Sequence, residues 1–520
     1  MVNFQCNLCK SIIIIDNKKK IKYLFYLLFV LIFVIRNTLY GQTTYQQFDQ
    51  YFSTSNHIKQ FNGNALVAEN KKVVYIKSIG FADFDTKKRL TENSQFPIAS
   101  ITKIFTSTAI LQLKQKGRLR LDDPVKTYLP DFPYTEITIR QLLSNTSGLA
   151  QYYNLFDTIM FQFPEKIITN RDIIPTFIQY KTPLQFTPGE KWDYNNVNFC
   201  IAALIIEKIT ELSYQDYIKQ NIFEPSNMKN SVVPINRKIL QKNQVELYSF
   251  PNRYSTTLKN VKTIPENFRI DGRSNFYGNG GIVSTSEDLY KFVQALFSGK
   301  LIDKEELNEA FTPAKLNNGN LAGYKLENTK INYGLGWEMY DDEKDGKIVF
   351  HDGSITGLTS ILAFNITKKQ TLILLENTGN TSMYTVSNTV FNILNGISFT
   401  PPAENFVRQY GNAIAQGQFE RAEYLVSSYQ KTPKNYSITE SEMNKLGYQL
   451  LRHNKKDAAI SVFRTTTKIF PESWNAFDSY AEALLANGQK TKAIKMYQKS
   501  LELNPNNENG KQILLKINSK

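Results

Sequence analysis

The sequence predicts an α+β domain followed by an all-α module, and three observations lead to this prediction. Strand patterns occur near residues 63–83 and again between residues 347 and 375, whereas the region between them is rich in short helical patterns. Strands at both ends with helices in the middle imply a sheet that is assembled from distant parts of the chain. Beyond residue 400 the Gly and strand signals fade, and the text becomes almost wholly helical.

The first 41 residues are typical of an export segment. Four Lys residues between positions 18 and 22 precede an apolar run over residues 23–35, which suits a signal-peptide core and is short for a transmembrane helix. The small Gly41 is a candidate cleavage point, and an uncleaved N-terminal membrane anchor is the alternative. We therefore expect an exported protein of the periplasm or cell envelope, either secreted or attached to the membrane through this segment.

Composition excludes several classes of protein. The chain has 520 residues, of which 42% are hydrophobic and 13% aromatic, so disordered and fibrous folds are disfavoured. The formal charge is +15, but the Lys residues are spread along the chain and do not cluster with aromatics, so nucleic-acid binding is not expected. Cys6 and Cys9 lie in the leader and Cys200 stands alone, so neither a disulfide framework nor a cysteine metal site is predicted.

The elements of the first domain follow from local patterns. Alternating residues over 63–83 predict a hairpin with its turn at Asn70-Lys71, and apolar residues at helical spacing predict a helix from Ser100 to Gly117. Between residues 121 and 270 we expect short helices and Pro-punctuated loops. The late elements are three predicted strands and one predicted helix, at residues 347–351, 358–366, 370–375 and 384–394.

A repeat marks the second part of the chain, after Pro401-Pro402. Six residues recur thirty-four positions later: Leu450, Leu451, Ala459, Ile460, Phe463 and Pro471 become Leu484, Leu485, Ala493, Ile494, Tyr497 and Pro505. This period and pattern resemble a tetratricopeptide repeat, and an ordinary helical bundle is the alternative. Because two full repeats are few for an independent solenoid, we expect the module to lean on the preceding domain or on a protein partner. The predicted division is a leader over 1–41, an α+β domain over 42–398 and helical repeats over 399–520.

Ser100-Ile-Thr-Lys103 places a hydroxyl and an amine one turn apart on the same face of a helix start. A serine becomes a good nucleophile when a base takes its proton, and a lysine can do so when burial or nearby positive charge lowers its pKa. The amide donors of the helix N-terminus can also face a developing oxyanion. The spacing alone is weak evidence, because Ser226 to Lys229 and Ser428 to Lys431 show it too. Without further motifs, a helix cap is the favoured interpretation of Ser100.

Two further motifs follow Ser100 in a fixed order. Tyr194-Asn195-Asn196 comes after a Pro-Gly and aromatic stretch, and His351-Asp-Gly353 ends the first late strand. With Ser-x-x-Lys, these motifs resemble the serine β-lactamase and penicillin-binding family, in the class C-like branch that includes D-amino-acid-releasing peptidases and esterases. Four more stretches support the resemblance, which spans residues 61–394: Leu121-Asp-Asp-Pro, Ile139 to Leu149, Gly278 to Leu289 and Tyr333-Gly-Leu-Gly-Trp337.

The resemblance implies a β-lactamase/DD-peptidase-like domain with an antiparallel sheet, flanking helices and a mostly helical middle region. It implies that Ser100 forms an acyl-enzyme while Lys103 and Tyr194 share the proton transfers, with the identity of the acylation base left open. Asn196 would hydrogen-bond Lys103 or the substrate.

On the substrate side, the resemblance implies that the backbone N–H groups of Ser100 and Ser354 form the oxyanion hole. His351 and Gly353 would line the strand beside the substrate. Neither a metal nor an organic cofactor is expected.

Departures from the family pattern bear on the substrate. His351 stands where relatives have the Lys of Lys-Thr-Gly, so a fixed cation is replaced by a side chain that is mostly neutral at pH 7. Esters, amides and peptides, including D-amino-acid and cell-wall-derived peptides, are therefore as plausible as β-lactams. Asn195 replaces a common Ser and Asn145 a common His, and neither position is required for acyl chemistry.

Two rival functions remain at this stage. A non-catalytic protein could keep the fold for ligand or partner binding, although the full set of Ser100, Lys103 and Tyr194 is retained. A Ser-His-Asp hydrolase is disfavoured, because no Gly-x-Ser-x-Gly elbow occurs and the region offers only His57 and His351. The expected ligand is a small molecule or peptide, with a protein partner possible through the repeats.

Overall fold

The computed structural model describes residues 44–163, 165–236, 239–264, 274–326, 329–342, 346–380 and 382–518. The predicted export segment over residues 1–41 lies outside the described residues. In the part of the chain that the structure describes, none of the helices has both the length and the apolar character needed to cross a bilayer.

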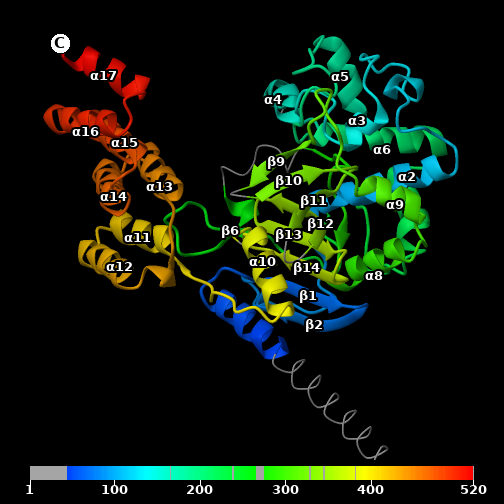
Figure 1. Ribbon diagram of the computed structural model, residues 1–520, viewed down its shortest axis with the longest axis horizontal. Coiled ribbons are helices and arrows are strands. Elements are labelled where there is room, and N and C mark those ends of the chain that lie inside the picture. Colours follow the sequence, from blue (N-terminus) through cyan, green and yellow to red (C-terminus); the bar gives the residue numbers. More distant parts are fainter. Residues whose placement is uncertain are drawn as a thin grey trace, which may run out of the picture.

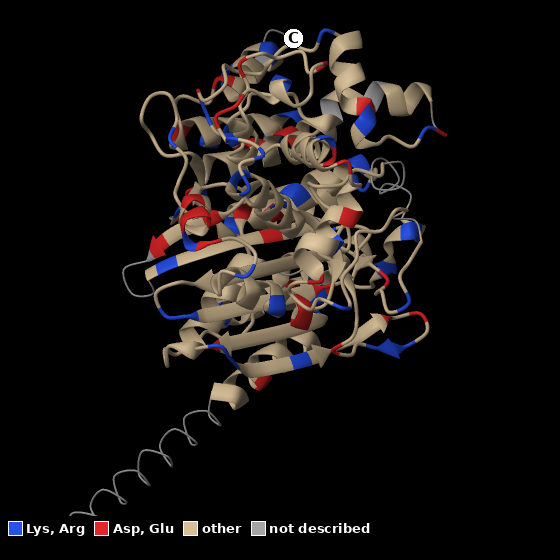
Figure 2. Ribbon diagram, turned by 90° about the vertical axis from the view of Figure 1, so that its right-hand side faces the viewer, with Lys and Arg blue, Asp and Glu red and all other residues tan. Residues whose placement is uncertain are grey.

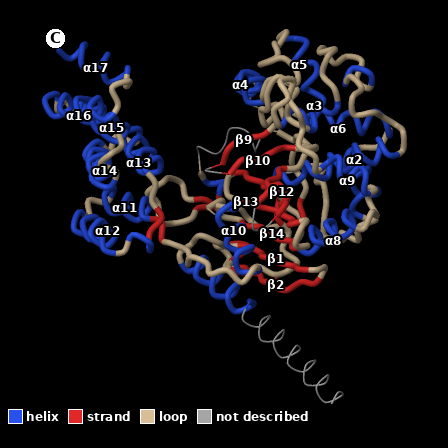
Figure 3. Tube along the Cα trace, viewed as in Figure 1, coloured by secondary structure: helices blue, strands red, loops and turns tan. Residues whose placement is uncertain are grey.

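An antiparallel sheet forms the framework of the first domain (Figures 1 and 3). Its strand order is β2-β1-β14-β13-β12-β11-β10-β9, so the N-terminal hairpin pairs with the last strand of the domain. The strands are β1 (Gly63–Glu69), β2 (Lys72–Ile79), β9 (Gly323–Leu326), β10 (Thr329–Tyr333), β11 (Glu338–Asp342), β12 (Gly346–Ile355), β13 (Leu358–Asn365) and β14 (Gln370–Glu376).

The predicted hairpin and late strands are confirmed. Asn70 and Lys71 form the turn between β1 and β2, with φ of 49° and 65°, left-handed values that Asn tolerates well. Strands β9 to β11 were not predicted, because each has only four or five residues and β11 reads Glu-Met-Tyr-Asp-Asp, which carries little strand signal.

The central strands are apolar on both faces. Leu66 and Ala68 of β1 belong to one core, and Ala65 and Val67 belong to the other, as expected from the two-residue period of a strand. On one face lie the helix over residues 44–57 and α10 (Met383–Leu394), and on the other lies the helical middle region. The predicted helix over 384–394 is thus confirmed as α10.

The helical middle region packs around α2 (Thr102–Gln115), which is buried from Thr102 to Leu113. Gly117, with φ of 66°, follows its C-terminus as predicted. The surrounding helices are α3 (Ile139–Leu143), α4 (Tyr152–Gln162), α5 (Ile173–Gln179), α6 (Asn196–Thr210), α7 (Tyr214–Ile218), α8 (Ser286–Phe297) and α9 (Lys304–Ala310). Helix α8 covers β1 and β14, which joins this region to the sheet.

Seven helices follow the first domain and form the C-terminal helical region, residues 406–518 (Figure 1). They are α11 (Phe406–Ala415), α12 (Phe419–Lys431), α13 (Glu440–Arg452), α14 (Lys456–Ile469), α15 (Trp474–Ala486), α16 (Lys490–Leu503) and α17 (Glu508–Asn518). Consecutive helices pack as antiparallel pairs. Gly417, Asn454 and Gly488 each stand two residues after the first helix of a pair, with φ of 71°, 58° and 76°.

A loop of the first domain holds the C-terminal helical region. The loop joins β6 (Tyr248–Ser249) to β7 (Lys259–Asn260) and reaches α11 and α13. Arg253 pairs with Glu442, and the Tyr254 hydroxyl hydrogen-bonds His453 Nδ1 at 2.6 Å.

Lys and Arg are interspersed with Asp and Glu over the face seen in Figure 2.

Candidate active site

Ser100 lies in a tight turn immediately before α2. Residues Ala99–Ile101 form a single 3₁₀ turn, and Ala99 has a left-handed φ of 45°, which is unfavourable for a residue with a Cβ. Such local strain persists only where the surroundings enforce it, and it is common at functional sites. The turn leaves Ser100 partly exposed, whereas Lys103, one turn later, is fully buried.

Lys103 connects the candidate catalytic groups. Its Nζ lies 3.0 Å from Ser100 Oγ, 2.8 Å from Asn196 Oδ1 and 2.9 Å from the carbonyl oxygen of Asn279. Burial lowers the pKa of Lys103 to about 7, although Cys200, Asp352 and Glu338 act in the opposite direction. A substantial share of the side chain is therefore unprotonated at neutral pH, and a neutral amine can accept the Ser100 proton across the 3.0 Å contact.

Tyr194 and Asn196 reach the site from the start of α6. Asn195 caps this helix, because its side chain accepts a hydrogen bond from the Val197 N–H at 2.9 Å. The cap fixes Asn196 against Lys103 and turns Tyr194 toward the same amine, whose Nζ lies 4.7 Å from the centre of the Tyr194 ring. Ser100, Lys103, Tyr194 and Asn196 are thus brought together in one place.

Asn145 braces this arrangement from the loop after α3. Its Oδ1 accepts from the Asn195 N–H at 3.1 Å and from Asn198 Nδ2 at 2.9 Å, and its carbonyl accepts from the Asp193 N–H at 2.9 Å. Asn145 also has a left-handed φ of 58°, which an Asn adopts more readily than most residues. The departure from the family pattern therefore has a structural role in holding the Tyr194 segment.

The loop over Gly278 to Gly281 lies between α6 and the Ser100 turn and contacts Lys103. Gly278 has φ of 87°, and a Cβ there would lie 2.4 Å from the Phe199 carbonyl, so the loop packs directly on α6. A Cβ at Gly280 would meet only the Ala99 carbonyl, at an ordinary 3.7 Å. The Asn279 carbonyl that binds Lys103 was not predicted, because a backbone acceptor has no residue-type signature.

Strand β12 brings His351, Gly353 and Ser354 alongside Ser100. Pairing with β11 ends at Phe350, which leaves the next residues of β12 without a strand neighbour on that side. The Ser100 turn occupies part of this edge, since a Cβ at Gly353 would lie 2.4 Å from the Ile98 carbonyl and 3.0 Å from the Ser100 nitrogen. Ser354 is exposed at the same edge.

His351 is buried and electrically neutral. Its Nδ1–H donates to the Asp352 carbonyl at 2.6 Å, which leaves Nε2 as an acceptor 3.4 Å from the Tyr333 hydroxyl. Burial, helped by the nearby Lys103, lowers the pKa of His351 to about 3. The third motif therefore presents no cation at neutral pH.

A set of residues behind His351 was not predicted from the sequence. Glu338 is 3% exposed, and its Oε1 lies 3.9 Å from His351 Nδ1. Its Oε2 accepts a hydrogen bond from the Tyr324 hydroxyl at 2.5 Å. Trp192 stacks on Tyr324 with ring centres 5.2 Å apart. Aromatic rings thus form one wall of the site next to Tyr194.

The ligand atoms of Glu338, His351 and Asp352 all lie within 4.8 Å of one another. This spacing is compatible with a metal site. However, His351 Nδ1 already donates to a carbonyl, and Lys103 interacts electrostatically with both carboxyl groups. The arrangement therefore favours exchange of protons over binding of a cation.

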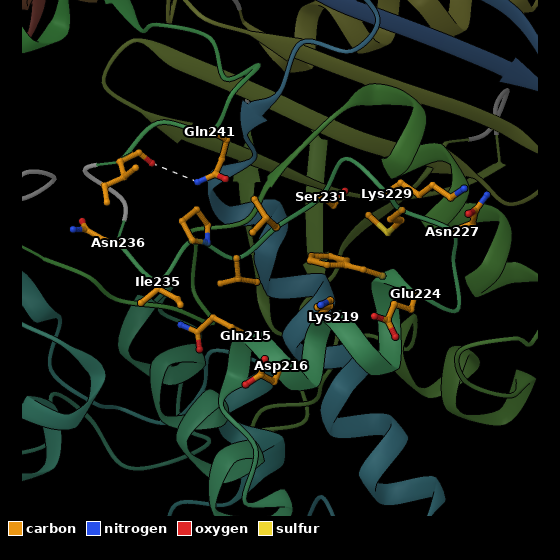
Figure 4. A pocket seen from close by; sticks show the side chains of 16 residues that line it. Gln215, Asp216, Lys219, Glu224, Asn227, Lys229, Ser231, Ile235, Asn236 and Gln241 are labelled. Carbon is orange, nitrogen blue, oxygen red and sulfur yellow. Dashed lines mark hydrogen bonds between the residues drawn. The ribbon is translucent and has the colours of Figure 1, made fainter.

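A cavity of about 790 Å³ lies apart from these groups (Figure 4). It is lined by residues of α7 and of the segment around residues 227–241, among them Asp216, Lys219 and Met228. None of the predicted site residues lines it. This cavity is therefore separate from the groups around Ser100.

Comparisons with known proteins match the first domain. The family described as "Beta-lactamase" matches residues 48–392. Penicillin-binding protein 4* of Bacillus subtilis is 35% identical over 329 residues, covering 63% of this chain and 70% of that protein. The putative penicillin-binding protein PbpX of the same bacterium is 29% identical over 354 residues, covering 67% and 79%.

Solved structures show the same fold for the first domain. The D-amino acid amidase of Ochrobactrum anthropi in complex with D-phenylalanine has a TM-score of 0.55 at 23% identity, covering 67% of this chain and 98% of that one. The octameric penicillin-binding protein homologue of Pyrococcus abyssi also has a TM-score of 0.55 at 23% identity, covering 70% and 79%.

Proposed function

The chain belongs to the beta-lactamase family, and we propose that it is a serine hydrolase that cleaves an ester, amide or peptide bond through an acyl-enzyme at Ser100. The single observation that carries the assignment of the nucleophile is the 3.0 Å contact between Ser100 Oγ and the buried Lys103 Nζ. A base whose pKa lies near 7 is suited to general-base catalysis at neutral pH.

In the proposed acylation, Ser100 Oγ attacks the carbonyl carbon while its proton passes to Lys103 or Tyr194. The backbone N–H groups of Ser100 and Ser354 stabilise the oxyanion, and such a donor contributes about 3 to 4 kcal/mol. The proton then moves to the leaving group as the acyl bond breaks. In the second half of the reaction a water molecule attacks the acyl carbonyl and passes a proton to Tyr194 in its phenolate form, and that proton returns to Ser100 Oγ as the acyl bond breaks.

The proposed substrates are amides, esters and peptides that do not depend on a free carboxylate. This proposal is supported by the neutral His351, which stands in place of the cation that binds a carboxylate in Lys-Thr-Gly relatives. One structural neighbour is named as a D-amino acid amidase, and two relatives are named as penicillin-binding proteins. We therefore place D-amino-acid amides and cell-wall-derived peptides first among the candidates.

We further propose that residues 399–520 form tetratricopeptide-like repeats that bind a protein partner. The pairs α13–α14 and α15–α16 begin thirty-four residues apart, and Ala459 and Ala493 are both completely buried at equivalent positions. A photo-reactive residue in place of Tyr424, which is 70% exposed on α12, would cross-link such a partner in an envelope extract. Repeated absence of a specific adduct would count against the recruiting role.

The relatives named as penicillin-binding proteins also support a location in the cell envelope. We propose that residues 1–41 direct export and either are removed or attach the chain to the membrane. Intact mass of the exported protein distinguishes these outcomes, since a chain that begins at Met1 would contradict cleavage near Gly41.

The decisive experiment is intact-mass spectrometry of the protein after exposure to a fluorophosphonate and, separately, to a penicillin. Ser100→Ala serves as the control. An adduct with the fluorophosphonate alone, lost in Ser100→Ala, is the expected result. Adducts with both reagents would extend the substrates to β-lactams, and no adduct with either would favour a non-catalytic binding protein on the same fold.

A further inference from the structure

Glu338 is a buried acid that the proposed reaction does not use. It is the first residue of β11 and directly follows Trp337, and only 3% of it is exposed. Burial of a carboxylate costs far more than burial of a neutral acid unless positive charge or several hydrogen bonds compensate. The surroundings of Glu338 therefore decide which form it takes.

Those surroundings offer little compensation. Within the described residues, Glu338 Oε2 accepts from the Tyr324 hydroxyl at 2.5 Å, and the sole basic atom recorded within 4.0 Å of its carboxyl is His351 Nδ1, at 3.9 Å from Oε1. His351 is neutral, and its Nδ1–H is directed at the Asp352 carbonyl. Glu338 consequently lacks a charged partner in direct contact.

The other groups that face Glu338 act in both directions. Asp352 of β12 has its carboxyl within 4.8 Å of that of Glu338, and two such groups resist simultaneous ionisation. Lys103 of α2 acts across a longer distance and favours the carboxylate. The phenols of Tyr324 on β9 and Tyr333 on β10 are held un-ionised by burial.

We propose that Glu338 is a positioning residue for acyl transfer at Ser100, which as a neutral carboxylic acid anchors Tyr324 and keeps negative charge away from Lys103. The inference rests on the proposed function of Ser100. Burial and the neighbouring Asp352 raise the pKa of Glu338 to about 8, whereas burial lowers that of Lys103 to about 7. Between these values Glu338 keeps its proton while Lys103 has released its own.

The consequence is a pH window for acylation. Below pH 7 Lys103 is protonated and cannot accept the Ser100 proton. Above pH 8 Glu338 ionises, and its negative charge raises the pKa of Lys103 and opposes the oxyanion that develops at Ser100. Acylation is fastest between the two values and declines on both sides.

The test is the pH dependence of fluorophosphonate labelling at Ser100 in the wild type, Glu338→Gln and Asp341→Asn. Gln keeps the size and the acceptor oxygen of Glu338 but cannot ionise. Asp341 lies on the same strand and is exposed, so Asp341→Asn controls for the loss of one carboxyl from β11.

The expected result is that Glu338→Gln loses the decline above pH 8, so that its labelling rate relative to wild type is about threefold higher at pH 9 than at pH 7. Asp341→Asn should keep the wild-type profile. Tyr324→Phe separates positioning from charge, because it removes the hydrogen bond and should slow labelling without removing the decline. An unchanged decline in Glu338→Gln would overturn the proposal.

A second measurement does not depend on activity. Carboxyl ¹³C resonances of glutamate-labelled protein should include two that titrate far above the usual range, from Glu338 and from the buried Glu376, whose pKa burial raises to about 7. The higher one should vanish in Glu338→Gln. Its absence from the wild type would overturn the charge assignment even if Ser100 is labelled, whereas its presence without labelling would refute only the proposed hydrolase function.

Discussion

Ionisable groups have opposite surroundings in the two parts of the molecule. Around Ser100 the ionisable side chains are almost completely buried, as Lys103, His351 and Glu338 show. Burial lowers the pKa of Lys103 and His351 and raises that of Glu338, so it favours the neutral form of each. Where the first domain meets the C-terminal helical region, Arg253 and Glu442 pair with side chains 39% and 42% exposed. Burial therefore favours the neutral forms around Ser100, whereas solvent screens the attraction between Arg253 and Glu442.

The largest effect is expected at Lys103. Lys103→Met removes the base at similar volume, and loss of a general base slows a reaction by about 10² to 10⁴-fold, so we expect Ser100 labelling at pH 7.5 to fall by about 10³-fold. Labelling kinetics measured by intact mass check this expectation. A rate within tenfold of wild type would show that Tyr194 alone takes the proton.

The same substitution should leave the fold intact or stabilise it. The pKa of Lys103 is lower in the folded than in the unfolded chain, so the unfavourable burial is fully present below about pH 7 and disappears as the pH approaches the unfolded value of 10.5. Lys103→Met should therefore raise the thermal midpoint more at pH 6 than at pH 10. Equal shifts at both pH values would contradict the lowered pKa.

Gly353 lies where β12 packs directly against the Ser100 turn, and a substitution there tests that geometry. A Cβ there would lie 2.4 Å from the Ile98 carbonyl and 2.6 Å from Ser360 Oγ, so Gly353→Ala must displace β12 from Ser100. A displacement of about 1 Å at a reacting centre can cost about 10²-fold in rate, and we expect a loss of that size in Ser100 labelling. The matched control is Gly280→Ala, whose Cβ would make an ordinary 3.7 Å contact and should change the rate little.

The sequence predicts the side chains that form recognisable motifs, but it does not predict residues whose position depends on strand register. Ser100, Lys103, Tyr194 and His351 were predicted because their three motifs, in that order, resemble those of a known family, and the structure brings these side chains together. Glu338 was missed although Trp337, its neighbour, had been noted. Its burial depends on the register of β11 against β10 and β12, which no local pattern encodes.

The repeat shows the converse case. A thirty-four-residue period predicted helix pairs without any chemistry, and α13 to α16 follow that period. The two helix pairs have small residues at equivalent positions: a Cβ at Gly447 would lie 2.4 Å from the Phe463 ring, and the equivalent Ala481 is completely buried. Small residues at helix crossings are visible in the sequence, whereas the contact between this region and the β6–β7 loop is not.

Leu446→Ala should weaken the C-terminal helical region and spare the reaction. Leu446 is completely buried in the core of that region, and removing such a side chain costs about 2 to 5 kcal/mol of unfolding free energy. Urea unfolding should show an earlier transition for this region, with Ser100 labelling in native buffer within twofold of wild type. Leu515→Ala, at a side chain 72% exposed, is the control and should shift the transition by less than about 0.5 kcal/mol. A parallel loss of labelling would mean that the two regions are coupled.

The smallest effect is expected at the contact between the regions. Arg253→Gln removes one charge from a half-exposed pair, and such pairs contribute about 0.2 to 1 kcal/mol, less at high salt. A double-mutant cycle with Glu442→Gln should give a coupling energy in that range, falling further in 0.5 M NaCl. The Tyr254–His453 hydrogen bond and the Arg408 guanidinium, 3.6 Å from the centre of the Phe250 ring, remain in both single variants and hold the contact. A coupling energy above about 2 kcal/mol would show that this ion pair behaves like a buried one. The two parts of the molecule would then not differ in how strongly their charges interact.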